Sequence, residues 1–250
     1  MAKNLLILTA TIAPQTEKSI IRLDKNTRLN DYKIALEFYR KNLDSNFDIL
    51  FVENSDSIHL IESDYKSIRK VKFIQAPLDN RSLVSGKSAG EIEMLKFLCL
   101  KNYLEKYDYI WKVTGRLVIK NINELVKENT SDIYVYRFRE AHSCDSRFFG
   151  MRYELFCNFA SKKISFEENA DNMEKRLLNA FQSMEYYLAY FCVQMSEIGL
   201  RLSTPIHIPY YVGFGASTGK KLNTIKFRLF FFLTNKLRRF AIRVLGGYTA

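Results

Sequence analysis

The sequence predicts an α/β protein built on an open, mostly parallel sheet, and three observations support this class. Apolar stretches of strand length alternate with stretches of helical periodicity over residues 1–140. The chain has 250 residues, of which 47% are apolar, enough to bury one large core. Two apolar stretches also run directly into polar residues, at 53–55 and 114–116, as parallel strands do where they end at a binding site.

The elements can be assigned in order along the chain. Residues 3–9 form a continuous apolar run, the pattern of a parallel strand buried on both faces. Apolar spacing predicts a helix at 28–42, with Asn30 or Asp31 as its cap. Further strands are expected at 48–52, 71–75, 107–113 and 133–138, and further helices at 56–70, 91–106 and 172–199. Residues 78–90 and 205–219 read as loops and 139–165 as an irregular segment, which completes a Rossmann-like order of elements.

Several classes of protein are excluded by what the sequence lacks. The turn after the first strand reads ThrAlaThrIleAlaPro at 9–14, without the GxGxxG of a dinucleotide fold, and no Walker lysine motif occurs. The apolar run at 5–8 is too short for a secretory signal, and no run approaches the roughly 20 residues of a membrane span. The cysteines form no CxxC pair and are expected to be reduced core thiols of a cytosolic protein: Cys99, Cys144, Cys157 and Cys192.

The formal net charge of +11 is concentrated in the last residues of the chain. No acidic residue follows Glu197, and eight cations lie between Lys220 and Arg243. Apolar residues recur there at spacings of three and four, which predicts a basic amphipathic helix that lies on an anionic membrane surface. An ordinary terminal helix docked on the core is the alternative. A nucleic-acid patch is disfavoured, because the PheArgLeuPhePhePheLeu stretch at 227–233 is more apolar than phosphate binding requires.

Six short motifs carry a resemblance to a known family. They are ThrAlaThrIle at 9–12, ArgLeuAsnAspTyrLysIleAlaLeu at 28–36, ValGluAsnSer at 52–55, GlyLysSerAlaGlyGlu at 86–91, LysValThrGlyArg at 112–116 and AspSerArg at 145–147. In this order they resemble small bacterial glycosyltransferases that build surface polysaccharide or lipooligosaccharide. The resemblance covers about residues 5–219. It implies one Rossmann-like domain of the GT-A type at 1–219, followed by the basic tail at 220–250.

On that fold, the resemblance implies that a nucleotide-sugar donor binds at the ends of the strands. The residues expected to receive the nucleoside follow the first two strands and are Thr9, Ala10, Thr11, Glu53 and Asn54. Glu53 is expected to accept hydrogen bonds from the base or the ribose. The residues expected around the diphosphate are Lys87, Lys112, Thr114, Gly115, Arg116 and Arg147.

One departure from the family pattern concerns the metal. Relatives usually carry an Asp-x-Asp motif at the end of the strand at 107–113, and its carboxylates hold a divalent cation. Here that place reads LysValThrGlyArg, and no Asp-x-Asp occurs anywhere in the chain. Because Lys112 and Arg116 would repel a metal ion, we expect them to neutralise the diphosphate themselves. The sequence therefore favours metal-independent transfer with no cofactor, although Mg²⁺ and Mn²⁺ stay open.

Inverting transfer would also need a carboxylate that takes the proton of the acceptor hydroxyl, and there are three candidates. Glu185 lies among apolar and aromatic residues of the helix at 172–199, where burial would raise its pKa. Asp145 and Glu91 are the others. The alternative for Asp145 is to cap a turn or orient Arg147, and the alternative for Glu91 is to favour the start of its helix. His207 is interpreted as a packed core histidine.

The acceptor side is expected near the loop at 205–219. Tyr210 and Tyr211 could stack on an acceptor sugar, and Ser217 lies in a glycine-rich run at 213–219 that could approach phosphate closely. The sequence thus predicts a cytoplasmic glycosyltransferase, peripheral on the inner membrane, that acts on a saccharide or lipid-linked acceptor. The alternatives are a non-catalytic protein that binds anionic membrane surfaces and a sugar nucleotidyltransferase. Nucleic acid is not an expected partner.

Overall fold

The computed structural model describes residues 3–14, 24–65, 70–78, 87–138, 143–161, 184–203 and 209–212. Its centre is a seven-stranded sheet with the strand order β3-β2-β1-β4-β7-β6-β8. The parallel half consists of β1 (Asn4–Ala10), β2 (Phe47–Glu53), β3 (Val71–Gln75) and β4 (Tyr109–Thr114). The other half consists of β6 (Ile133–Phe138), β7 (Ser143–Arg152) and β8 (Leu202–Ser203), in which β7 runs antiparallel to β4 and β6. The predicted α/β class with a mainly parallel sheet is confirmed.

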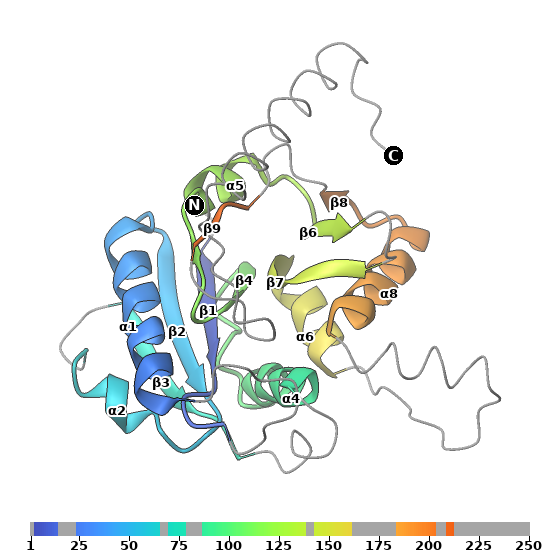
Figure 1. Cartoon of the computed structure of the whole chain (residues 1–250). Helices are drawn as coiled ribbons and strands as arrows, with labels where there is room; N and C mark the ends of the chain where they lie inside the picture. The colour runs from blue at the N-terminus through green and yellow to red at the C-terminus, as the bar shows by residue number, and fades with distance from the viewer. Residues whose placement is uncertain are drawn as a thin grey trace, which may run out of the picture.

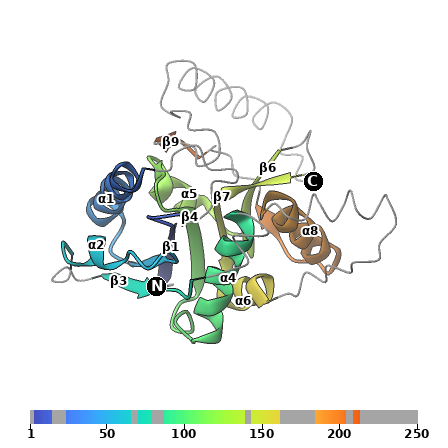
Figure 2. The same cartoon turned by 60° about the horizontal axis from the view of Figure 1, so that its bottom comes forward.

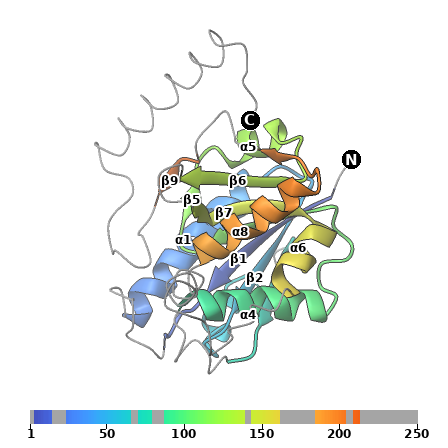
Figure 3. The same ribbon diagram turned by 90° about the vertical axis from the view of Figure 1, so that its right-hand side faces the viewer.

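Helices cover both faces of this sheet. On one face lie α1 (Lys25–Asn42), α2 (His59–Glu62) and α5 (Ile122–Glu128), and on the other lie α4 (Lys87–Leu100), α6 (Tyr153–Ser161) and α8 (Met184–Glu197). Figures 1 and 2 show α1 and the α4, α6 and α8 group on opposite sides of β1 and β4, and Figure 3 shows the group in front of the strands. The result is a three-layer arrangement with one apolar core on each face of the sheet.

Strand β1 lies between the two cores, which explains its continuous apolar sequence. Leu5 and Ile7 face the core formed with α4, α6 and α8, whereas Leu6 and Leu8 face the core formed with α1. All four side chains are buried, because successive side chains of a strand point to opposite faces and both faces are covered.

Several predicted boundaries differ from those of the structure. Helix α1 begins before the predicted start, because Asp24 rather than Asn30 or Asp31 caps it: its carboxylate accepts from the Thr27 N–H at 2.7 Å. Among the described residues of the helix predicted at 56–70, only the four residues of α2 are helical. Helix α4 spans Lys87–Leu100 rather than 91–106. The largest error lies at 139–165, predicted as irregular, where β7 and α6 form instead.

A small second sheet joins the end of the described chain to its middle. β5 (Val118–Ile119) pairs antiparallel with β9 (Tyr211–Val212), and the Lys120 N–H donates to the Tyr210 carbonyl at 2.9 Å. The loop predicted at 205–219 therefore contains a strand. This pairing brings Tyr211 beside β7, where it is buried.

Two further expectations concern the cysteines and the membrane. None of the four cysteines forms a disulfide; Cys99, Cys144 and Cys192 are buried and Cys157 is half-buried, so their expected place in or against the core is confirmed. Within the described ranges, none of the helices has both the length and the apolar character that a membrane span requires. The basic tail at 220–250 lies outside the described residues.

The contact between β4 and β7 depends on a glycine. Trp111 stacks on Phe148, with ring centroids 5.5 Å apart, and its ring also lies against the backbone of Gly150. A Cβ atom at Gly150 would lie 2.6 Å from Trp111 Cε3 and 2.7 Å from the Tyr109 ring. Only glycine therefore allows the two strands to pair with these rings in place.

We predict that Gly150→Ala lowers the free energy of unfolding by about 1–3 kcal/mol, because the added methyl group overpacks the rings. Urea unfolding measures the loss, and the emission of Trp111, the sole tryptophan, should shift. Gly199→Ala is the control: Gly199 has a φ of +83° and no atom within 4 Å of an added Cβ, so this change strains the backbone but should leave the emission unaltered. An unshifted spectrum for Gly150→Ala would contradict the packing described.

Candidate functional site

The parallel strands end side by side at one edge of the sheet. Ala10 of β1 pairs with Glu53 of β2, and Thr9 pairs with Thr114 of β4. The polar residues that follow these strands therefore lie next to one another, in the position where open α/β sheets bind ligands. Residues 145–147, at the start of the antiparallel β7, continue this edge beyond the end of β4.

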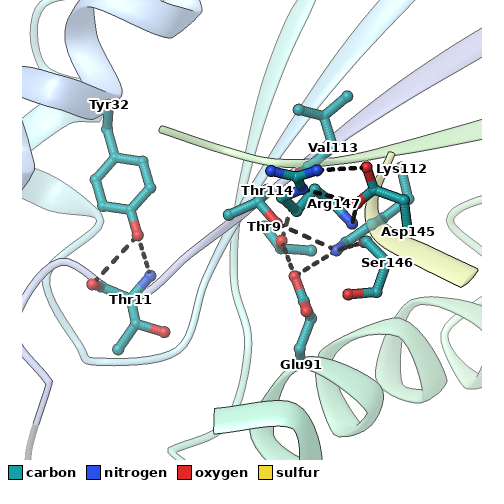
Figure 4. A network of polar contacts seen from close by, with 10 residues as sticks. All are labelled: Thr9, Thr11, Tyr32, Glu91, Lys112, Val113, Thr114, Asp145, Ser146 and Arg147. Carbon is teal, nitrogen blue, oxygen red and sulfur yellow. Dashed lines mark hydrogen bonds and ion pairs between the residues drawn. The ribbon is translucent and has the colours of Figure 1, made fainter. Parts of the chain in front are cut away.

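A buried lysine lies at the centre of the edge. Lys112 Nζ is 2.6 Å from Glu91 Oε1, donates to the Ser146 carbonyl at 2.7 Å and lies 3.5 Å from Thr114 Oγ1. Thr9 Oγ1 donates to the same Glu91 oxygen at 2.6 Å. Figure 4 shows these groups converging from β1, β4, α4 and β7. The side chain of Lys112 is 0% exposed, so its positive charge is balanced inside the protein by Glu91.

The start of β7 carries a second ion pair, and this one reaches the surface. Arg147 Nε and one terminal nitrogen donate to the two oxygens of Asp145, at 2.8 and 2.7 Å. The Tyr211 hydroxyl donates to Asp145 Oδ2 at 2.8 Å, and the Arg147 guanidinium carbon lies 4.3 Å from the centre of the Tyr211 ring. Burial and the charge of Asp145 raise the pKa of Tyr211 well above its ordinary value, so the phenol stays a donor. Asp145 is buried, whereas the Arg147 side chain is 32% exposed.

Glu53 is occupied by the protein's own backbone. One carboxylate oxygen accepts from the Ile12 and Ser55 N–H groups at 3.0 and 2.9 Å, and also from the Ser55 hydroxyl, while the other accepts from the Ser57 N–H at 2.9 Å. The side chain is fully buried. Glu53 therefore fixes the loops after β1 and β2, which corrects the expectation that it would bind a base or ribose directly.

The loop after β1 is held from its other side by α1. The Arg28 guanidinium donates to the Thr11 carbonyl, and the Tyr32 hydroxyl accepts from the Thr11 N–H at 3.0 Å. Thr11 Oγ1 also donates to Asn54 Oδ1 at 2.7 Å. These contacts give the ArgLeuAsnAspTyr motif at 28–32 a structural role that the sequence did not reveal, since helical spacing shows only which side chains share a face.

Arg116 faces α1 rather than solvent. Its side chain is 1% exposed, one terminal nitrogen lies 3.7 Å from Asp31 Oδ2, and the guanidinium carbon lies 5.9 Å from the centre of the Tyr32 ring. The preceding Gly115 allows this packing, because a Cβ there would lie 2.7 Å from the Thr9 carbonyl oxygen and 3.3 Å from the Tyr32 ring.

These positions correct the expectation that Lys112 and Arg116 contact a diphosphate. Both charges are buried and held beside internal carboxylates. Among the donor-site candidates whose side chains the structure describes, Thr11 and Arg147 are half-buried, and the others are buried: Thr9, Ala10, Glu53, Asn54, Lys112, Thr114, Gly115 and Arg116. Lys87 is the first residue of α4, and its side chain lies outside what the structure describes.

Two of the three candidate bases are likewise committed to other partners. Glu91 holds Lys112 and accepts from Thr9, and Asp145 holds Arg147 and accepts from Tyr211. Glu185 lies in the first turn of α8, a helix that packs against β7, and its role stays a prediction because its side chain is not described.

The acceptor-side candidates are only partly described. Tyr211 is buried and belongs to the Asp145 and Arg147 group. The Tyr210 N–H donates to Asn121 Oδ1 at 2.8 Å, and this residue is half-buried beside α5. Ser217, like His207, falls outside the described residues.

The residues at the end of β4 do not fit a divalent metal. In the described part of the chain no three His, Cys, Asp or Glu side chains come together as metal ligands. The nearby carboxylates, Glu91 and Asp145, are each bound by a cationic side chain. A metal ion would have to displace Lys112 or Arg147 from its partner before it could use either carboxylate.

Comparisons with known proteins return structural likenesses only. No family model matches the sequence, and no curated protein matches it either. A protein named as a nucleotide-diphospho-sugar transferase from Desulfovibrio desulfuricans shares 12% identity, with a TM-score of 0.48 over 96% of this chain and 98% of that one. The mannosyltransferase PcManGT from Pyrobaculum calidifontis, in complex with GDP-Man and Mn²⁺, shares 10% identity, with a TM-score of 0.49 over 100% of this chain and 66% of that one.

A third likeness involves a 4-diphosphocytidyl-2C-methyl-D-erythritol synthase. It shares 10% identity with this chain and has a TM-score of 0.42 over 95% of this chain and 98% of that one. None of the three reaches a TM-score of 0.5. The function proposed below therefore rests on the sequence and on the geometry of the site.

We predict that Lys112→Met lowers the free energy of unfolding by about 3–5 kcal/mol, because it leaves the Glu91 carboxylate buried without its cation. The double variant Lys112→Met/Glu91→Leu should recover most of this loss, since it removes both charges and keeps apolar volume. Urea unfolding of the four members of the cycle measures the coupling.

Lys101→Met is the matched control, because Lys101 is exposed at the end of α4, and its loss should stay within about 0.5 kcal/mol. A double variant whose loss equals the sum of the two single losses would show that the buried pair is not coupled.

Proposed function

We propose that the protein is a glycosyltransferase that moves a sugar from a nucleotide-sugar donor to a saccharide or lipid-linked acceptor, without a metal ion. The observation that carries this proposal is the Arg147 guanidinium, which is half-buried at the carboxyl edge of the sheet. Asp145 forms a bidentate ion pair with it, and the Tyr211 ring stacks against it. A cation fixed in this way is suited to an anionic leaving group.

The chemistry of the donor explains why a fixed arginine would matter. Transfer breaks the bond between the sugar and the phosphate oxygen of the nucleotide, and negative charge builds up on the departing nucleotide phosphate as that bond breaks. A preorganised cation stabilises the charge without reorganising, which lowers the barrier. Arginine presents five N–H donors in a planar fork that matches phosphate oxygens. Because Asp145 is buried and also bound by Tyr211, the guanidinium keeps its orientation.

The buried residues act as positioning residues in this scheme. Lys112 binds the Ser146 carbonyl, so the ion pair with Glu91 fixes the backbone between Asp145 and Arg147. Glu53, Arg28 and Tyr32 fix the loop after β1, where the half-buried Thr11 would meet the nucleoside. Lys112 and Glu53, which the sequence predicts to contact the donor, thus act one layer beneath it in this proposal.

The acceptor is activated by proton removal. A carboxylate takes the proton of the acceptor hydroxyl as its oxygen attacks the sugar carbon that the diphosphate leaves. Since Glu91 and Asp145 are each committed to a cation, Glu185 is the candidate that we assign to this step. Lys87, at the start of α4, is assigned a second contact to the diphosphate.

We predict that the cognate nucleotide sugar among UDP-, GDP-, CMP- and dTDP-sugars stabilises the protein by about 2.7 kcal/mol at a hundred times its Kd. Thermal shift measures this stabilisation.

Arg147→Met should lower the rate of transfer about 10²- to 10³-fold, because one preorganised charge at the leaving group is lost. Product formation measures the rate. Arg152→Met is the matched control: Arg152 lies at the other end of β7, paired with Asp132, and its loss should leave transfer unchanged.

Metal independence is tested in the same assay. Transfer in excess EDTA should equal transfer in Mg²⁺ or Mn²⁺, since the carboxylates at this edge already hold cations. Activity that EDTA abolishes and Mn²⁺ restores would overturn this part of the proposal. Stabilisation by none of the four donor classes would instead favour the non-catalytic alternative.

The basic segment at 220–250 suggests where the enzyme works. We propose that it holds the protein on the anionic inner surface of a membrane, so that lipid-linked acceptors are within reach. Support comes from its eight cations and its apolar spacing, since each Lys or Arg near an anionic leaflet contributes about 1 kcal/mol.

Replacing Lys236, Arg238, Arg239 and Arg243 with glutamine should reduce co-sedimentation with phosphatidylglycerol vesicles at least tenfold, because half of the eight cations of the segment are removed. The matched control makes the same change of net charge at four exposed lysines elsewhere, namely Lys25, Lys41, Lys101 and Lys127. Equal loss in the two variants would show that net charge, rather than this segment, governs the binding.

A further inference from the structure

A polar hollow lies at the end of the sheet where the parallel strands begin, opposite the end that carries Arg147. It has a volume of about 240 Å³ and is formed where β1, β2 and β3 begin, together with the connection from α4 to β4. Since β1 to β3 are parallel, their first residues lie far along the strands from Ala10 and Glu53. The hollow is therefore separate from the candidate donor site.

The charge around the hollow is strongly positive. Lys70, Lys72 and Lys106 line it, and Asp48 is the lining residue with a carboxylate. Asp48 Oδ2 lies 3.6 Å from Lys106 Nζ and accepts from the Tyr107 hydroxyl at 2.8 Å. It also lies 3.7 Å from Lys3 Nζ, which adds a fourth cation beside the hollow, while Asp108, which accepts from the Lys3 N–H at 2.6 Å, adds a second carboxylate there. Burial and Asp48 raise the pKa of Tyr107, so its hydroxyl stays a donor to the carboxylate.

Two of the lysines lack a carboxylate partner within the described residues. Lys70 Nζ donates to the Ser45 carbonyl at 3.1 Å, and Lys72 Nζ lies 4.5 Å from the centre of the Tyr103 ring. Both side chains are exposed at the rim. An anion that enters the hollow would meet these ammonium groups together with that of Lys106, whose single Asp48 contact is shared with Lys3.

The walls and floor suit a small organic group attached to the anion. Leu5 and Leu50 are buried apolar side chains among the lining residues, and Tyr103 and Tyr107 contribute aromatic rings. A tyrosine ring packs well against the carbon face of a sugar or a glycerol chain. The volume is smaller than that of most drug-sized pockets, which limits the occupant to a compact molecule.

We propose that this hollow binds a phosphate monoester, with the phosphate on Lys70, Lys72 and Lys106 and the organic part against Tyr103 and Tyr107. Lysine is a point charge that binds phosphate oxygens without a fixed geometry, as suits a rim of flexible side chains. The ester has two possible sources, a small soluble molecule or the headgroup of a lipid, and both present the same group to the lysines.

The test uses the full chain and two probes. Isothermal titration with sn-glycerol 3-phosphate examines the soluble source, and co-sedimentation with phosphatidylcholine vesicles that contain phosphatidic acid examines the lipid source. Lys72→Met/Lys106→Met should weaken binding of at least one probe tenfold or more. Lys101→Met/Lys120→Met is the matched control, because it removes the same charge from two exposed lysines that do not line the hollow. Lys101 matches Lys106, since both lie on the connection from α4 to β4. Lys120 matches Lys72, since its Nζ also lies over an aromatic ring, that of Phe38, at 4.8 Å.

The outcomes separate the two sources and the two sites. If Lys72→Met/Lys106→Met loses binding of sn-glycerol 3-phosphate, the ligand is a small soluble phosphate ester. If it loses only binding of the vesicles, the ligand is a lipid headgroup. Arg147→Met should change neither result, since Arg147 lies at the other edge of the sheet. Equal binding by the two lysine pairs, or no binding of either probe by the unaltered protein, would overturn the proposal.

Discussion

The ammonium group of Lys112 is the constraint on which the rest of the site depends. It lies at the end of the central strand with no exposure to water, and such a charge is tolerated only when other groups replace its hydration. Glu91 supplies the opposite charge from α4, and the Ser146 carbonyl completes the shell from β7. One side chain therefore ties a parallel strand, an antiparallel strand and a helix together at the sheet edge. The Lys112–Glu91 pair thereby positions the neighbouring segments at Thr9 and Ser146, which bind Glu91 and Lys112.

The parallel half of the fold could be predicted because each of its strands satisfies one simple rule. β1, β2 and β4 are covered on both faces, so they are nearly continuous apolar runs. β7 breaks that rule at both ends: near its start it carries the ion-paired Asp145 and Arg147, and near its end it carries Gly150, where the Trp111 ring requires open space. These polar residues and this glycine interrupt the apolar pattern by which a buried strand is predicted. The opposite holds for α2, since among the described residues of 56–70 weak helical periodicity extends beyond the four residues that form the helix.

The site could be predicted in position but not in depth. That polar groups would gather at the ends of β1, β2 and β4 follows from parallel topology alone. Which of these groups reaches solvent depends on partners from elsewhere in the chain: Asp31 lies beside Arg116, and backbone N–H groups occupy Glu53. Local sequence does not show these partners, because they come from α1 and from loops that pack only after folding. The hollow where β1 to β3 begin could not be predicted for the same reason, since Lys72 and Lys106 look like ordinary surface lysines in the sequence.

The β5–β9 pairing has a geometric consequence for whatever follows it. The chain leaves the described core at Val212, next to the tyrosine that supports Arg147. Eight residue steps separate Val212 from Lys220, and an extended chain spans at most about 3.5 Å per residue. The connecting segment is therefore no longer than about 28 Å. Any surface bound by Lys220 is therefore held within about the diameter of a small domain from Arg147. A molecule embedded in such a surface would be presented at high effective concentration rather than encountered by free diffusion.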